Sequence, residues 1–190
     1  MNEAPLTVRL GVRDRPSLVT HFTALEGEDR RLRFGSTIGN DGMSQYVERL
    51  DFARDGIFAV QDADLRLLAV VHVAVTDAAA ELGLSVLPGL RGRGLGNALF
   101  VRAVMYLRNR GLTEVFVHCI TENAAMMHLA RKHGMRVVYS GSESDASLAL
   151  EPATAQSFVN EWLHDQKGST IRTLRENALL TQRMLGFFSH

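Results

Sequence analysis

The sequence lacks features on which several classes of protein depend. Its single cysteine, Cys119, can form neither an internal disulfide nor a thiolate metal site. The 21 Lys and Arg residues balance 21 Asp and Glu residues, so no overall positive field gathers nucleic acid or anionic lipid. The longest apolar run, Leu67 to Val75, contains His72 and is too short to cross a bilayer. The first five residues have neither the basic nor the apolar region of a signal peptide. We therefore expect a protein of the reducing cytoplasm that binds neither nucleic acid nor membrane.

The remaining composition indicates one folded domain with an addition. The chain has 190 residues, of which 46% are hydrophobic and 22% charged, and this is enough to bury a sizeable core. The histidines share no helical face with carboxylates, so we expect no metal site.

The hydrophobic pattern predicts an α/β domain in the first 151 residues. Strand 82–87, helix 95–107 and strand 115–120 form a βαβ unit, which requires a parallel pair inside a mixed sheet. Two further apolar runs before this unit, at 57–60 and 67–75, indicate an antiparallel meander. The other predicted elements are a strand at 7–12, a helix at 16–25, a loop at 26–42, a helix at 43–50, a helix at 123–133, and strands at 136–139 and 147–150.

Residues 152–190 are rich in helix formers, and we interpret them as a C-terminal helical extension. Gly168 predicts a break between two helices. The second helix carries an apolar stripe without a local partner, which would pack either on its own domain or on a second subunit; we expect a homodimer to which this helix contributes. The stripe consists of Ile171, Leu174, Ala178, Leu185 and Phe188.

The segment from Val86 to Asn97 carries the strongest functional signal. It joins a strand to a helix, so the free N–H groups and positive dipole of the helix N-terminus face an open site suited to a phosphate or pyrophosphate. Gly92, Gly94 and Gly96 permit a close backbone approach. The neighbouring arginines, Arg91 and Arg93, add local positive charge.

Three phosphate-binding patterns compete for this loop. The Walker pattern requires Gly-Lys followed by Ser or Thr, which the chain lacks. The Rossmann pattern requires a small residue where Asn97 or Leu99 stands. The third pattern, Arg/Gln-x-x-Gly-x-Gly/Ala, is met by Arg91, Gly94 and Gly96. This third pattern resembles the acyl-CoA pyrophosphate loop of the GNAT superfamily of N-acetyltransferases.

A second motif strengthens the resemblance, which covers residues 81–138 most specifically. In GNAT proteins an Asn opens a helix that closes with Lys-x-Gly-aromatic; here Asn123, Lys132 and Gly134 match, and Met135 replaces the aromatic residue. The sequence Arg-Leu-Arg-Phe at 31–34, together with Glu81 at the head of a strand, is most similar to the bacterial Pat-type protein acetyltransferases.

The resemblance implies a GNAT fold in which acetyl-CoA occupies a V-shaped gap between two splayed parallel strands, here ending near Leu87 and Cys119. Backbone groups around Val86 and Leu87 would hold the pantetheine arm and polarise the thioester carbonyl. Asn123 would bond the same arm. The pyrophosphate would bind the backbone amides of Arg91, Gly92, Arg93, Gly94, Leu95, Gly96 and Asn97.

Because Glu81 matches the Pat-type position, the resemblance makes it the candidate general base. The alternation of residues around Glu81 also fits a solvated carboxylate at the end of a strand. Burial beside Leu82 and Leu84 would raise its pKa toward the operating range. Many GNAT enzymes protonate the departing thiolate with a Tyr where this chain has Ala130. Water, Cys119, His128 or Tyr139 remain as alternatives, or the thiolate leaves unassisted.

The resemblance implies direct transfer of an acetyl group to a primary amine. Two alternatives remain from the sequence: a non-catalytic acyl-CoA-binding regulatory module, and an interaction protein that uses the tail helices. The acceptor amine, whether on a protein lysine or on a small molecule, is not encoded in any motif that can be read from the chain.

Overall fold

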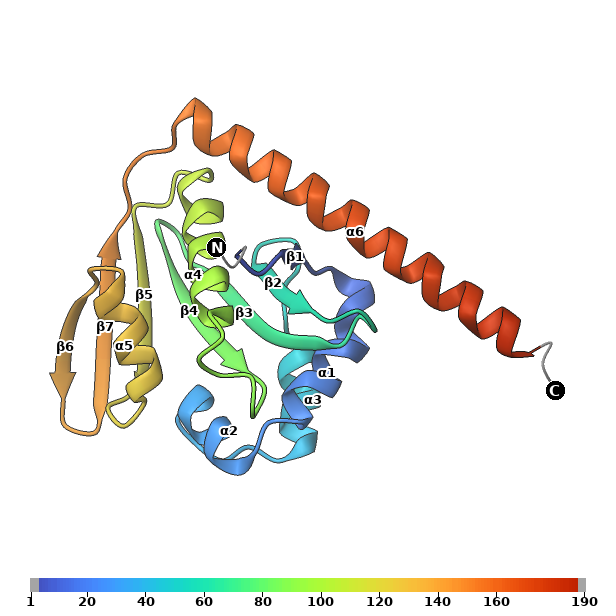
Figure 1. The fold of residues 1–190 in the computed structure, drawn as a ribbon. Coiled ribbons are helices and arrows are strands. Elements are labelled where there is room, and N and C mark those ends of the chain that lie inside the picture. Colours follow the sequence, from blue (N-terminus) through green and yellow to red (C-terminus); the bar gives the residue numbers. More distant parts are fainter. Residues whose placement is uncertain (1–3, 188–190) are drawn as a thin grey trace.

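The computed structural model describes residues 4–187, which fold around a seven-stranded mixed sheet with helices on both faces (Figure 1). The strand order is β1-β2-β3-β4-β5-β7-β6. The strands are β1 (Thr7–Arg9), β2 (Gly56–Gln61), β3 (Leu67–Val75), β4 (Ala79–Val86), β5 (Glu114–Ile120), β6 (Arg136–Ser140) and β7 (Glu143–Ala149). The helices are the 3-10 turn η1 (Val12–Asp14), α1 (Arg15–Thr23), α2 (Gly27–Phe34), α3 (Asn40–Glu48), α4 (Leu95–Arg108), α5 (Ala124–Lys132) and α6 (Ala155–Phe187).

The sheet confirms the predicted βαβ unit and the splayed parallel strands. β4 and β5 are parallel but pair over only three positions, from Ala79–Glu114 to Glu81–Phe116. Beyond the last pair the two strands run apart toward α2 (Figure 1). The edge of β4 that faces β5 therefore has no strand partner after Glu81, and its backbone groups are available to a ligand.

Strand alternation divides the interior into two cores, one on each face of the sheet. Along β3, Val71 and Val73 belong to the core covered by α4 and α5, whereas Val70 belongs to the core covered by α1 and α3. The second core includes Phe22 of α1, which is 1% exposed. The β2–β3–β4 meander follows the predicted order. Its apolar residues are buried on both faces of the sheet.

The prediction of a loop over residues 26–42 is wrong, because α2 forms inside it. The helix has acidic side chains in its first turn, Glu28 and Asp29, and basic ones in its last, Arg31 and Arg33, which complement the helix dipole. Gly35 ends it in the left-handed conformation, with φ of 74°. The predicted first strand is also shorter than expected, since it ends at Arg9 and the turn η1 follows.

The predicted break at Gly168 is also wrong, because α6 is one continuous helix of 33 residues. The glycine lies where α6 crosses β1, and a β-carbon there would stand 3.0 Å from the backbone oxygen of Thr7. Gly168 thus permits close packing of the helix on the strand. Of the predicted stripe, Ile171 is half-buried and Leu174 exposed, while Phe188 falls outside the described residues.

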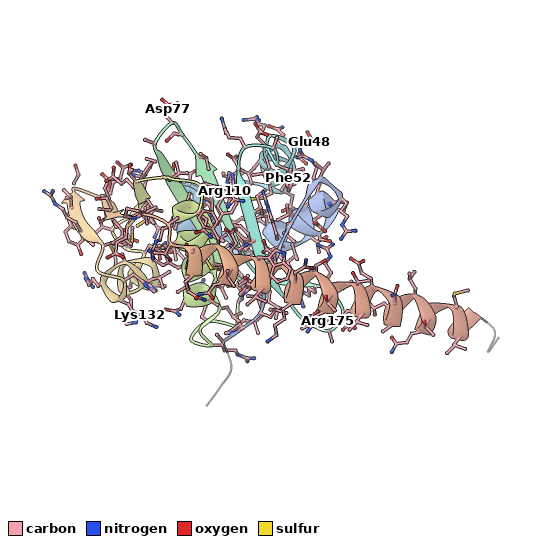
Figure 2. The ribbon with its side chains drawn as sticks, turned by 90° about the horizontal axis from the view of Figure 1, so that it is seen from above. Glu48, Phe52, Asp77, Arg110, Lys132 and Arg175 are labelled. Atoms are coloured by element: carbon pink, nitrogen blue, oxygen red, sulfur yellow. The ribbon has the colours of Figure 1, made fainter. Side chains whose placement is uncertain are left out.

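Polar contacts attach α6 to the domain. Arg102 of α4, only 2% exposed, donates to Glu161 (3.0 Å) and Asp165 (2.6 Å), and Arg175 donates to the carbonyl of Asp62 (2.9 Å). Beyond Arg175 the helix extends away from the sheet (Figure 2). Large hydrophobic residues are exposed along it: Phe158, Val159, Trp162, Leu163, Leu174, Leu180, Met184 and Leu185.

Candidate acyl-CoA site

The glycine-rich loop enters α4 through a backbone conformation that needs glycine. Gly94 is the N-cap of α4 with φ of 78°, and Gly92 has φ of 75°. Both lie in the left-handed region, where a side chain is strained. Gly96 has a different role, because a β-carbon there would stand 3.4 Å from the Leu84 Cδ2 atom of β4. The loop therefore presents its amides at the N-terminus of α4 with little side-chain cover.

A cavity of about 610 Å³ opens beside this loop, between the free edge of β4, the start of α5 and the overlying α2. Leu87 does not line the cavity because it is buried in the α1–α3 core, and Arg93 is exposed outside it. The predicted cofactor-binding residues that do line it are Val86, Arg91, Gly92, Gly94, Leu95, Gly96, Asn97 and Asn123.

Helix α2 covers the cavity, a part of the site that the sequence did not reveal. Asp29 forms an ion pair with Arg91 of the loop, and Arg31 forms another with Glu122 at the start of the α5 region. These two ion pairs join α2 to both walls of the cavity. From residue 28 to residue 33 the charged side chains change from acidic to basic, and Gly35 follows. This local pattern could have indicated the helix from the sequence.

Asn123 has a structural role at the cavity wall. Its Oδ1 atom accepts a hydrogen bond from the Met126 amide (3.0 Å) and so caps α5, while its Nδ2 atom donates to the carbonyl of Leu32 (3.1 Å). A bond from this amide to a pantetheine arm would therefore replace the Leu32 contact. The side chain thus lines the cavity with both of its amide atoms already bonded within the protein.

Glu81 stands at the last paired position before β4 and β5 separate. Its side chain is exposed, so the expected burial beside Leu82 and Leu84 is wrong. It does not line the cavity itself but lies on the strand face shared with Gly83 two residues further along. Burial lowers the pKa of His72 and the Asp145 hydrogen bond raises that of His118; the negative charge of Glu81 makes only a small upward contribution to each.

The two residues at the end of β5 lie on opposite faces. His118 is exposed and contacts Asp145 (2.7 Å), whose hydrogen bond raises the pKa of the imidazole. Cys119 belongs to the α4–α5 core, and burial raises the pKa of its thiol. A neutral buried thiol is a poor nucleophile.

The structure separates the candidates for protonating the thiolate. His128 lines the cavity, as does Lys132 at the end of the same helix. Cys119 does not line it, and Tyr139 is exposed on β6 with its hydroxyl bonded to Arg131 (2.6 Å). Among the four alternatives, His128 is thus the protein side chain that reaches the cavity.

A chain of polar groups under α2 was also missed from the sequence. Asp55 is buried and accepts from His72 Nε2 (3.0 Å), and His72 Nδ1 accepts from the Tyr46 hydroxyl (2.8 Å). The Tyr46 oxygen in turn accepts from Arg33 Nη2 (3.0 Å). Burial lowers the pKa of His72 and raises that of Tyr46, so both are neutral near pH 7. The chain ends at Arg33, which lines the cavity.

These features coincide with the match to a known family. The sequence model of the Acetyltransferase (GNAT) family matches residues 29–135, more than half of the chain. The chain belongs to the GNAT acetyltransferase family. The matched range of this GNAT protein includes α2 from Asp29 onward, the glycine-rich loop and α5, and so most of the residues that line the cavity.

Relatives support the same assignment. The GNAT protein is 35% identical over 117 residues to the mycothiol acetyltransferase of Beutenbergia cavernae, a match that covers 60% of this chain and about a third (35%) of that protein. Its fold resembles the GNAT domain of S. lividans PAT, with a TM-score of 0.66, 18% identity, and 76% and 89% of the two chains covered. It also resembles spermidine N-acetyltransferase from Vibrio cholerae, solved with CoA and spermine, with a TM-score of 0.62, 18% identity, and 78% and 96% covered.

Within residues 4–187, no helix is both long and apolar enough to cross a membrane. The same residues bring together no group of three His, Cys, Asp or Glu side chains that could hold a metal ion.

Proposed function

We propose that this GNAT protein transfers an acetyl group from acetyl-CoA directly to a primary amine. The observation that carries the proposal is the cavity at the splay of β4 and β5, which combines an amide-rich loop with the unpaired edge of β4. The amides of residues 91–97 would bind the pyrophosphate, and the free edge near Val86 would bind the pantetheine arm and polarise the thioester carbonyl. The proposal assigns no metal to the reaction.

In the proposed reaction the amine attacks the thioester carbon and the sulfur leaves. A cationic amine must first lose a proton, which Glu81 accepts directly or through a water molecule. The new C–N bond forms as the carbonyl electrons move to oxygen, and the nitrogen, now cationic, gives its remaining extra proton to water. The return of the oxygen electrons then breaks the C–S bond. The departing thiolate then takes a proton, and we assign this donation to His128 because it lines the cavity. CoA and an N-acetyl amine result.

Two further assignments accompany this proposal. We divide the chain into a GNAT domain over residues 1–151 and a helical extension over 152–190, because the segment between β7 and α6 contains neither helix nor strand. We also place the enzyme in the cytoplasm, where a free thiol such as Cys119 persists.

The test is a screen of amines with acetyl-CoA, in which release of free thiol and formation of N-acetyl product are both measured. Product formation with at least one amine class supports the proposal. Tight binding of acetyl-CoA, measured by calorimetry, without transfer to any amine or protein lysate would contradict it.

A further inference from the structure

Arg33 is a cation without an anionic partner in the wall of the cavity. It forms no ion pair with any carboxylate of residues 4–187, whereas Arg31 on the same helix pairs with Glu28 and Glu122. Its Nε atom is buried and has no hydrogen-bond partner among those residues. Within the described part of the chain, its side chain donates one hydrogen bond, to the neutral Tyr46 hydroxyl (3.0 Å). A largely enclosed guanidinium with unused donors favours a ligand that brings an anion.

The surroundings hold this guanidinium in one place. Its carbon atom lies 4.7 Å from the ring centre of Phe34 and 5.8 Å from that of Tyr46. These contacts orient the side chain without neutralising it. Tyr46 is fixed by His72, which is fixed by the buried Asp55. This chain of polar groups therefore holds Arg33 as a preorganised cation.

The position of Arg33 is on the acceptor side of the reaction. A β-carbon at Gly83 would overlap the guanidinium, so the absence of that carbon makes room for Arg33 directly over β4. Gly83 lies two residues beyond Glu81 on the same strand face, a spacing of about 7 Å. The pyrophosphate loop begins after Val86, a further ~10 Å along the strand. The guanidinium is thus beside the proposed base and away from the phosphates.

We propose that the acceptor is an amino acid, with a carboxylate that binds Arg33 while its amine faces Glu81. This inference rests on the proposed acetyl transfer and names its substrate class. The opposite charges on one strand face match the two charges of such a molecule, and the planar guanidinium can bind a carboxylate through two hydrogen bonds.

The test compares acceptors in matched pairs that differ only in the carboxylate: alanine with alaninamide, lysine with lysinamide, and 4-aminobutyrate with butylamine. The expected result is a higher kcat/KM for the carboxylate member of at least one pair. In Arg33→Gln this preference should fall about ten- to a hundredfold, since a hydrogen bond to a charged group is lost, while the partner without a carboxylate changes little. Arg33→Lys should retain part of the preference.

A control variant is Arg49→Gln, which removes an equal charge from an exposed side chain bonded to Gln45. It should leave both members of every pair unchanged. Acetyl-CoA affinity, measured by calorimetry, shows whether Arg33→Gln still folds and binds the donor. Transfer to both members of each pair with no preference for the carboxylate, or an equal loss for both members in Arg33→Gln, would overturn the inference while leaving acetyl transfer intact. Absence of transfer to every amine would instead contradict the proposed function.

Discussion

His21 should make the protein lose stability in mild acid. The side chain is 2% exposed, and its Nδ1 atom donates to the carbonyl of Leu67 (2.9 Å). Its Nε2 atom therefore accepts from the Ser85 hydroxyl (2.8 Å). Burial lowers the pKa of His21 from 6.5 to about 4, with the Leu67 bond opposing the shift. The folded protein thus keeps this imidazole neutral where an unfolded chain protonates it.

Proton linkage gives the sign and the size of this change in the free energy of unfolding. Above pH 6.5 the imidazole is neutral in both states and stability does not depend on it. As the pH falls from about 6.5 to about 4, the unfolded state binds a proton that the folded state does not, so the free energy of unfolding decreases. At 1.36 kcal/mol per pH unit, this one group accounts for a loss of about 3 kcal/mol over that window.

Urea unfolding at pH 7.5 and pH 4.5 measures the effect. His21→Gln should be less stable at pH 7.5 because it disturbs two buried hydrogen bonds, but it should lose about 2–3 kcal/mol less than wild type between the two pH values. His118→Gln is the control, since the pKa of His118 is raised and removing it cannot reduce the acid loss. Equal acid losses in wild type and His21→Gln would refute a buried neutral imidazole.

The remaining predictions concern the site and the association state. Gly94→Val should abolish tight CoA binding, measured by calorimetry. The control Gly111→Val, which is equally strained at φ of 74° but lies at the other end of α4, should leave CoA binding intact. Unchanged CoA affinity in Gly94→Val would exclude the loop as the pyrophosphate site. Glu81→Gln should keep acetyl-CoA affinity and lower turnover about a hundred- to ten-thousand-fold, with partial recovery at high pH as free amine becomes abundant. Wild-type turnover at neutral pH would show that another group is the base. The exposed apolar residues of α6 lead us to expect a homodimer, and light scattering at micromolar concentration that gives the 21.0 kDa mass of one chain would contradict it.

Local patterns in the sequence sufficed for much of the fold. The β2–β3–β4 meander was predictable because its strands are continuous apolar runs separated by turn residues, and α4 and α5 because their apolar residues recur at the helical period. The glycine-rich loop was equally readable, since its chemistry depends on neighbours within six residues, from Arg91 to Gly96.

Contacts between distant parts of the chain explain what could not be predicted. α2 has no strong apolar stripe, and it is joined to the cavity by ion pairs such as Arg31–Glu122, 91 residues apart. Gly168 normally weakens a helix by about 1 kcal/mol, yet here close packing on β1 outweighs that preference. The position of Arg33 depends on a missing side chain at Gly83, and no pattern within α2 reveals it.

The contact between α4 and α6 has a consequence for the order in which the chain acquires its structure during synthesis. Arg102 is buried in the folded chain, but its two carboxylate partners on α6, Glu161 and Asp165, are translated about 60 residues later. Until they emerge from the ribosome, the guanidinium lacks both partners, and burying it unpaired would cost several kcal/mol. Nascent chains that end near residue 151 should therefore stay open around α4, and native structure should be completed only when the start of α6 arrives.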